Sequence, residues 1–178
     1  MTITTTGLGV NLPISIERGL RHMAWANQEV FRAVSEMPND ALHAYISNPE
    51  WTVGKILAHI CDGATWYVHR LEIEDWIEIP QVNSAADVLK LATIISDLDE
   101  KLIAAASEED RELTYTYEDS GKVVKRWFST ILTQAIHHAT EHRAQLVDAL
   151  DFKGYKSIDL DKLDLWGYDM REKGEPLT

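Results

Sequence analysis

The amino-acid sequence predicts an all-α protein built as a four-helix bundle. Four segments carry apolar residues at intervals of three and four, which is the spacing of one helix face. A length of 178 residues suits one domain with one core, and no repeat, low-complexity tract or linker divides the chain. We therefore expect a single domain over residues 1–178, with a flexible arm at 1–12 and a C-terminal extension at 151–178.

The four predicted helices are separated by residues that end or begin helices. Pro38 follows the first apolar face, and either Asn83 or Ser84 can cap the third helix. Thr52 or Asn48 is a suitable N-cap for the second helix. The predicted helices cover about residues 20–37, 52–74, 85–103 and 129–150.

The segment between the third and fourth helices has a different pattern. From Leu113 to Tyr117 the residues alternate and are rich in Thr and Tyr. The turn sequence Asp119-Ser120-Gly121 and the pair Val123-Val124 follow. This order predicts a short β-hairpin or an extended connection before the last bundle helix. Near the C-terminus, residues 160 to about 170 are expected to form a short helix packed on the bundle.

Charge and cysteine content disfavour several classes of function. The formal net charge is -12 at pH 7, so the surface repels phosphate backbones and anionic membranes, and nucleic-acid binding is not expected. The apolar runs are much shorter than the roughly 20 residues that span a bilayer. The N-terminus lacks the basic and apolar regions of a signal peptide, and the chain has one cysteine. We therefore expect a cytoplasmic protein that does not associate with membranes.

Three histidines lie in the fourth predicted helix. His138 and His142 are four residues apart, so their rings project from one face, about 40° apart. That face also carries Ile131 and Ala135, which directs both imidazoles toward the interior of the bundle. His137 lies about 100° away and should be nearer solvent. Two neutral imidazoles at this spacing can each offer a ring nitrogen to one divalent ion.

A catalytic metal site needs a third protein ligand. His59 is the best candidate, because it lies in the second predicted helix on the flank of the apolar stripe, about 60° from Ile56. A second interpretation stays open, since a histidine pair on a helix can also be a pair of core or interface residues bonded to carbonyl groups. Spacing alone does not place His59 beside the pair.

The fourth predicted helix also carries the most specific motif of the chain. Residues 134–146 read Gln-Ala-Ile-His-His-Ala-Thr-Glu-His-Arg-Ala-Gln-Leu. They resemble the signature His-x-x-x-His-Arg-Gly-Gln-apolar of the DinB-like (damage-inducible, YfiT-related) superfamily, with Ala144 in place of the usual Gly. The segment Trp51-Thr-Val-Gly-Lys-Ile-Leu-Ala-His59 resembles the other family signature, and Trp25-Ala26-Asn27 resembles a third, weaker one.

The resemblance has implications for fold, cofactor and activity. It implies an up-down-down-up bundle with one divalent metal ion, typically nickel or zinc, on His59, His138 and His142, and with water in the open positions. Relatives with assigned activity use a low-molecular-weight thiol such as bacillithiol or mycothiol. The implied function is a metal-dependent thiol transferase with a thiol cosubstrate and a small-molecule substrate. Several members form dimers, which implies a homodimer.

Two other functions remain open at this point. The same open metal site suits metal-dependent hydrolysis. A non-catalytic metal-binding or dimerisation module is the other alternative, because no obvious general base accompanies the histidines. No residue is therefore assigned a catalytic role. Trp66 and Gln145 lie within about 20° of His59 and His138 on their helices, a position that fits packing as well as substrate contact.

The remaining polar residues near the histidines are expected to be structural. Arg143 points away from the ligand face, which suits a salt bridge between helices or between subunits. Asp62 and Glu141 are rotated about 60° from the neighbouring histidines on their helices. They are expected either at the surface or in contact with those histidines on the side away from the metal. Cys61 lies about 200° around the helix from His59 and is expected to be a small core residue.

Overall fold

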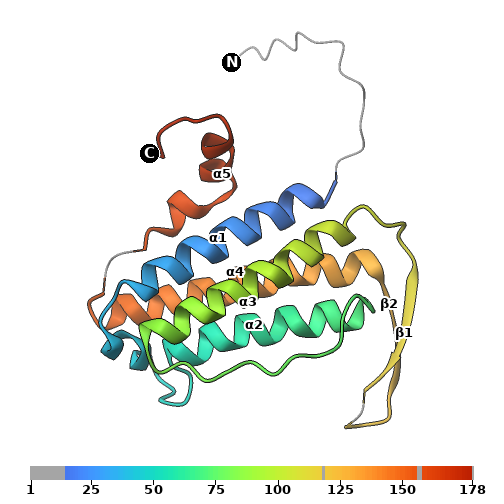
Figure 1. Cartoon of the computed structure of the whole chain (residues 1–178), viewed down its shortest axis with the longest axis horizontal. Coiled ribbons are helices and arrows are strands. Elements are labelled where there is room, and N and C mark those ends of the chain that lie inside the picture. The colour runs from blue at the N-terminus through green and yellow to red at the C-terminus, as the bar shows by residue number, and fades with distance from the viewer. Residues whose placement is uncertain (1–14, 118, 156–157, 178) are drawn as a thin grey trace.

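The chain is mostly helical, with one small two-stranded sheet (Figure 1). The computed structural model describes residues 15–117, 119–155 and 158–177, so the predicted arm at 1–12 lies outside the described residues. The long helices are α1 (Glu17–Ser35), α2 (Val53–Arg70), α3 (Ala85–Ala105) and α4 (Phe128–Phe152). The shorter elements are η1 (Asn39–His43), β1 (Glu112–Thr116), β2 (Val123–Trp127), η2 (Leu160–Leu163) and α5 (Leu165–Glu172).

The four long helices pack side by side around one core. α1 contacts α3 and α4, and α2 contacts the same two helices. In Figure 1, α1 and α4 run in one direction and α2 and α3 in the other. Apolar side chains from all four helices form one buried cluster, because each helix turns its apolar stripe inward. The largest of these side chains are Leu20, Phe31, Ile56, Leu57, Leu91, Leu98 and Phe128.

The helix ends follow local sequence signals, with one difference from the prediction. Thr52 caps α2 by accepting a hydrogen bond from the Lys55 amide, and Ser84 caps α3. The second helix was expected to reach residue 74, but α2 ends at Arg70. Glu72 has a φ of 61°, a left-handed conformation that no α-helix continues through. Leu71 is nevertheless buried, which explains why the apolar pattern runs past the helix.

The predicted hairpin is present and leads directly into α4. β1 and β2 pair antiparallel, with Glu112 opposite Trp127. The carboxylate of Asp110 accepts hydrogen bonds from both the amide and the hydroxyl of Ser129 in the first turn of α4. This contact satisfies a backbone donor at the helix start, where no intrahelical partner exists. The hairpin and the start of α4 are therefore tied together.

The predicted C-terminal helix is also present, as η2 followed by α5. These elements lie beside α1, where Arg18 forms ion pairs with Asp169 and Glu172. A ring nitrogen of His22 lies 2.8 Å from the carbonyl oxygen of Leu163. The C-terminal segment therefore covers one side of α1. Among the described helices, none has the length and apolar character needed to cross a membrane.

Candidate metal centre

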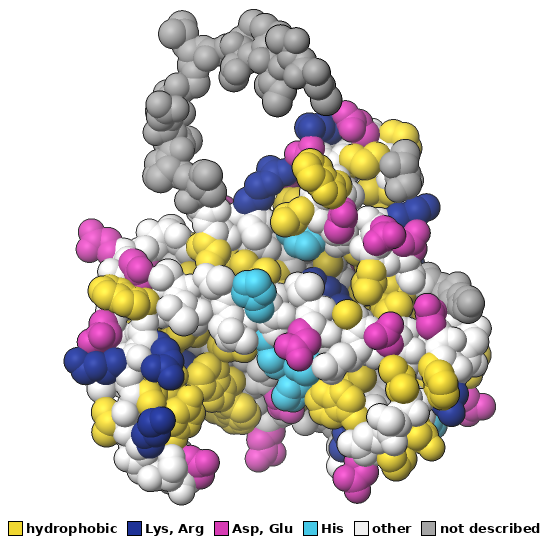
Figure 2. Space-filling view, turned by 180° about the vertical axis from the view of Figure 1, so that it is seen from behind, with side chains coloured by type: hydrophobic (Ala, Val, Ile, Leu, Met, Phe, Trp, Pro, Cys, Tyr) yellow, Lys and Arg dark blue, Asp and Glu magenta, His cyan; other side chains and the backbone are white. Residues whose placement is uncertain are grey.

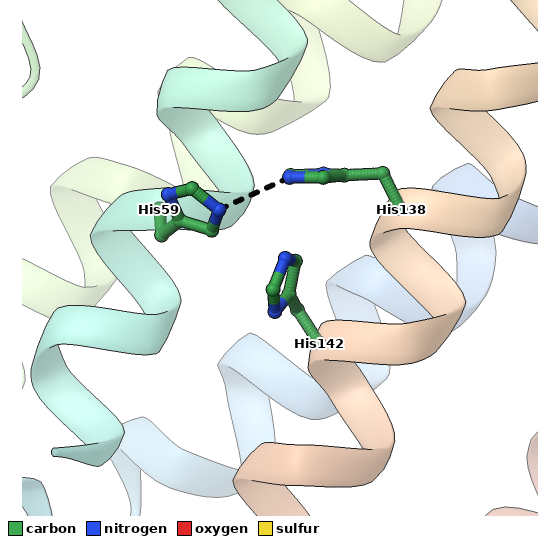
Figure 3. A group of neighbouring side chains, drawn as sticks. All are labelled: His59, His138 and His142. Carbon is green, nitrogen blue, oxygen red and sulfur yellow. Dashed lines mark hydrogen bonds between the residues drawn. The ribbon is translucent and has the colours of Figure 1, made fainter. Parts of the chain in front are cut away.

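Three histidines converge between α2 and α4 (Figure 3). His59 comes from α2, and His138 and His142 come from successive turns of α4. One ring nitrogen from each lies within 4.8 Å of the others. The Nε2 atoms of His59 and His138 are 3.2 Å apart. The structure thus brings together all three histidines that the sequence singled out.

The spacing of these nitrogens suits one metal ion. Two nitrogens that are each about 2.1 Å from the same ion lie about 3.0 Å apart at a right angle and about 3.4 Å apart at a tetrahedral angle. The observed 3.2 Å between His59 and His138 falls between these values. The three nitrogens also lie within 4.8 Å of one another, so the residues present fit a three-histidine site.

Their surroundings keep two of the imidazoles neutral. Burial, helped by the neighbouring His142 and His59, lowers the pKa of His138 to about 4. Burial also lowers the pKa of His59, helped by His142 and opposed by the carboxylate of Asp62. A neutral imidazole has a lone pair to give to a metal, whereas a protonated one has none. The site is therefore ready to bind a cation at neutral pH.

Trp51 and Gln145 fix which nitrogen of His142 faces the other histidines. The indole nitrogen of Trp51 donates a hydrogen bond of 3.1 Å to the Gln145 side-chain oxygen. An indole N–H can only donate, so the atom it meets is the amide oxygen. That same oxygen lies 2.9 Å from Nδ1 of His142, which must therefore carry a proton and donate. Nε2 of His142 is left with its lone pair free for a metal.

Gly63 makes room for the ring of His138. A Cβ atom at this position would lie 2.3 Å from Cε1 of His138 and 2.7 Å from Nδ1. Any side chain at residue 63 would therefore displace the imidazole from its present position. Glycine costs about 1 kcal/mol relative to alanine inside a helix, so its presence in α2 has a packing reason.

Two clefts open beside the histidine cluster. The larger, here called the polar cleft, has a volume of about 710 Å³ and a wall of mixed polar and apolar character, whose charged residues include Glu50 and Lys55. The smaller has a volume of about 390 Å³ and is lined by the rings of Trp66, Tyr67 and Trp76 together with His138. His59 and Asp62 line both. In Figure 2, histidine side chains reach the surface in a hollow between groups of hydrophobic side chains.

Comparison with known proteins assigns the chain to a family. The model of the DinB family matches residues 11–173. The chain belongs to the DinB family. It is also similar to Protein DinB of Bacillus subtilis (strain 168), with 24% identity over 156 residues that cover 77% of this chain and 85% of the relative. A search of the solved structures found no match.

The other residues that the sequence analysis considered near the histidines have distinct positions. His137 is exposed, as expected. Cys61 is fully buried, and burial raises the pKa of its thiol, which agrees with the expected core role. Asp62 is not part of the histidine cluster but lines both clefts, and burial raises the pKa of its carboxyl group. Trp66 lies in the wall of the aromatic cleft.

Arg143 of the signature differs in part from the expectation. It was predicted to form a salt bridge, but it is buried and donates to the side-chain oxygen of Asn27 in α1, at 2.7 Å. Asn27 in turn donates to Asp99 of α3, at 2.9 Å. The arginine therefore joins α4 to α1 by a hydrogen bond, and its charge reaches Asp99 only across Asn27. Asn27 belongs to the third signature, so two family motifs meet in this network.

Three of the site's residues have roles that sequence analysis did not assign. Gly63 and Trp51 were not recognised as supports of the histidines, and Gln145 was left between packing and substrate contact. Each left a signal in the sequence. Gly63 stands inside a helix four residues after His59, and Gln145 lies three residues after His142, so each residue is about one turn from a ligand candidate.

Proposed function

We propose that this protein is a metal-dependent thiol S-transferase that joins a low-molecular-weight thiol to an electrophilic small molecule. The observation that carries the proposal is the convergence of three histidine nitrogens at the meeting point of two clefts. The reaction class comes from the resemblance of the chain to this family, whose members with assigned activity are thiol-dependent. Cys61 is the only cysteine of the chain and is buried, so a reacting thiol has to come from a cosubstrate.

His59, His138 and His142 would hold one divalent ion, nickel or zinc, through their ring nitrogens. Three neutral ligands leave the full charge of the ion in place, and such an ion lowers the pKa of a thiol that binds to it. The protein's own residues prepare this site. Gln145 accepts the Nδ1 proton of His142, and Gly63 leaves space for His138.

The proposed reaction balances without any further reagent. The thiol sulfur forms a bond to the electrophilic carbon with its own electron pair. The bond from that carbon to the leaving group breaks, and its electron pair departs with the leaving group as an anion. The thiol proton passes to water. The rings of the aromatic cleft give an apolar surface beside His59 and His138, against which the electrophile would pack.

The same resemblance supports proposals about the whole molecule. The pairwise packing of the four long helices and their directions support an up-down-down-up four-helix bundle. The match of the family model over residues 11–173 supports one domain for the chain. A cytoplasmic location and a homodimer remain predictions, which fractionation and analytical ultracentrifugation test.

Metal analysis combined with turnover tests the proposed function. Protein purified without a chelator or a histidine tag should carry about one equivalent of nickel or zinc. A variant with His59, His138 and His142 all changed to Ala should carry none. The loaded protein should consume thiol only when an electrophile is present. Hydrolysis without added thiol would favour the hydrolase, and a protein that refuses added zinc and nickel would leave a packing role for the histidines.

A further inference from the structure

The histidine cluster stands between two clefts of different chemistry. Lys55, His59 and Trp66 lie on one face of α2, because they are spaced by four and seven residues. At a rise of about 1.5 Å per residue, Lys55 lies about 6 Å before His59 and Trp66 about 10 Å after it. One helix face thus passes from the polar cleft, past His59, into the aromatic cleft.

The polar cleft contains charged groups of both signs. Lys55 and Glu50 line it, both side chains are exposed, and neither forms an ion pair with any residue in the described ranges. The other acid of the cleft, Asp62, lies near His59; burial raises the pKa of its carboxyl group, and the charges of His59 and Lys55 oppose this rise. Lys55 can pair with a carboxylate of a ligand in this cleft, and Glu50 can pair with an ammonium group.

The aromatic cleft suits an apolar ring. Trp66 is held rigidly, since the guanidinium of Arg70 stacks on it at 5.3 Å and on Tyr115 of the hairpin at 4.7 Å. Trp76, from the segment after α2, is 46% exposed. A large aromatic side chain that stays accessible beside a fixed one provides a stacking surface for a flat ligand.

We propose that the polar cleft binds an amino-acid-derived thiol and the aromatic cleft binds an electrophile that carries an aromatic ring. The carboxylate of the thiol pairs with Lys55 and its ammonium group with Glu50, while the ring of the electrophile stacks on Trp66 and Trp76. The sulfur and the electrophilic carbon then meet beside His59. This assignment rests on the proposed function and adds the substrate class and the position of each substrate.

Binding of a conjugate tests the assignment directly. S-(2,4-dinitrophenyl)glutathione contains both proposed halves, and calorimetry with metal-loaded protein measures its affinity. We expect Trp76→Ala to weaken binding about 10-fold through lost stacking. Lys55→Gln should weaken it about 5-fold through one lost exposed ion pair. Lys55→Arg should restore most of the affinity. Two exposed residues outside the clefts provide matched controls, Trp166→Ala in α5 and Lys122→Gln beside the hairpin turn. Both control variants should bind the conjugate as the wild type does.

Steady-state kinetics separates the two substrates. With glutathione and 1-chloro-2,4-dinitrobenzene, Lys55→Gln should raise the KM for the thiol and Trp76→Ala the KM for the electrophile. Lys55→Gln should make no difference when the glutathione diethyl ester, which lacks both carboxylates, replaces glutathione. Trp76→Ala should make no difference when iodoacetamide, which has no ring, replaces the aryl chloride.

The outcomes distinguish this assignment from the proposed function. Turnover by the wild type together with unchanged conjugate binding in both variants overturns the two-cleft assignment and leaves the transferase in place. Conjugate binding that depends on both residues, without thiol-dependent turnover, overturns the transferase. The assignment is also overturned if the wild type does not bind the conjugate. A loss of conjugate affinity in only one of the two variants overturns it as well, because the assignment requires a contact to both the thiol part and the aromatic part.

Discussion

The histidine cluster between α2 and α4 and the polar network of Asn27, Asp99 and Arg143 both lie among packed helices. In the network, the side chains are almost fully buried and each bonds to the next. In the cluster, His59 and His138 are half-buried beside open clefts, and their Nε2 atoms face each other. The network uses its hydrogen-bonding groups on its neighbours, whereas the cluster keeps ring nitrogens available. That difference separates a structural polar group from a binding site.

Electrostatics separates the two regions in the same way. Burial raises the pKa of Asp99 to about 7, opposed by the hydrogen bond from Asn27 and the charge of Arg143. Burial lowers the pKa of His138 to about 4. One oxygen of Asp99 also lacks a hydrogen-bond partner within the described residues. In each region burial disfavours the charged form of the titratable group, Asp99 or His138. The network also contains an arginine, Arg143, whereas the cluster consists of histidines.

The largest effect is expected from breaking the network. Arg143→Met leaves Asp99 without its nearby positive charge and Asn27 without its donor, so the free energy of unfolding should fall by about 3–5 kcal/mol. Urea unfolding at pH 7.5 measures it. In metal-free protein His59→Leu should change stability by less than about 1 kcal/mol, because no buried charge loses a partner. Equal losses in the two variants would contradict the distinction between the regions.

A double variant sharpens that test. Asp99→Asn combined with Arg143→Met removes the acid as well as the arginine. It should therefore lose less stability than the two single variants added together, because neither charge is left buried alone. Strict additivity would mean that the arginine does not act on Asp99.

The next largest effect is expected at Gly63. Gly63→Ala places a methyl group where the ring of His138 now lies, so zinc affinity should fall about 100-fold while the helix stays folded. Competition with a zinc-binding dye measures the affinity. Gly19→Ala in α1 is the control, because its methyl group would meet only the flexible end of Ile136 at 3.0 Å. Unchanged zinc binding in Gly63→Ala would exclude His138 as a ligand.

A smaller effect is expected at Gln145. Gln145→Leu removes the acceptor that holds Nδ1 of His142 in its protonated form, and zinc affinity should fall about 10-fold. Trp51→Phe keeps a ring beside the histidines but removes the N–H donor, so its effect should be weaker. A loss in Trp51→Phe that exceeds the loss in Gln145→Leu would mean that packing, rather than the tautomer of His142, sets the affinity.

The smallest effect is a pair of opposite pH dependences in metal-free protein. Folded Asp99 binds a proton that the unfolded chain has released between about pH 4 and 7, so its contribution to stability is lost as pH rises through that range. The unfolded chain protonates His138 between about pH 6.5 and 4, so its contribution is lost as pH falls. Asp99→Asn should make stability rise more steeply with pH, and His138→Asn should make it rise less steeply.

Urea unfolding at several pH values, with a chelator present, measures these slopes. Each change should be no larger than about 1.4 kcal/mol per pH unit, the value for one proton. The exposed Asp148→Asn is a control and should leave the slope unchanged. Slopes that shift in the same direction in both variants would contradict the opposite pKa shifts.

The sequence by itself determined the helices and the identity of the three histidines. The helix faces follow from apolar residues at intervals of three and four, and His138 and His142 share a face because a turn of helix contains about 3.6 residues. These are local properties that spacing along one helix can express. The hairpin before α4 and the capping roles of Thr52 and Ser84 are equally local, and each was one of two alternatives that the sequence predicted.

Only the tertiary structure decided which residues meet across helices. His59 and His138 are 79 residues apart in the chain, and their Nε2 atoms approach only because α2 packs on α4. The contact between Arg143 and Asn27 and the space that Gly63 leaves for His138 depend on the same packing. Such contacts depend on how two helices lie against each other, and the spacing of residues along a single helix carries no information about that.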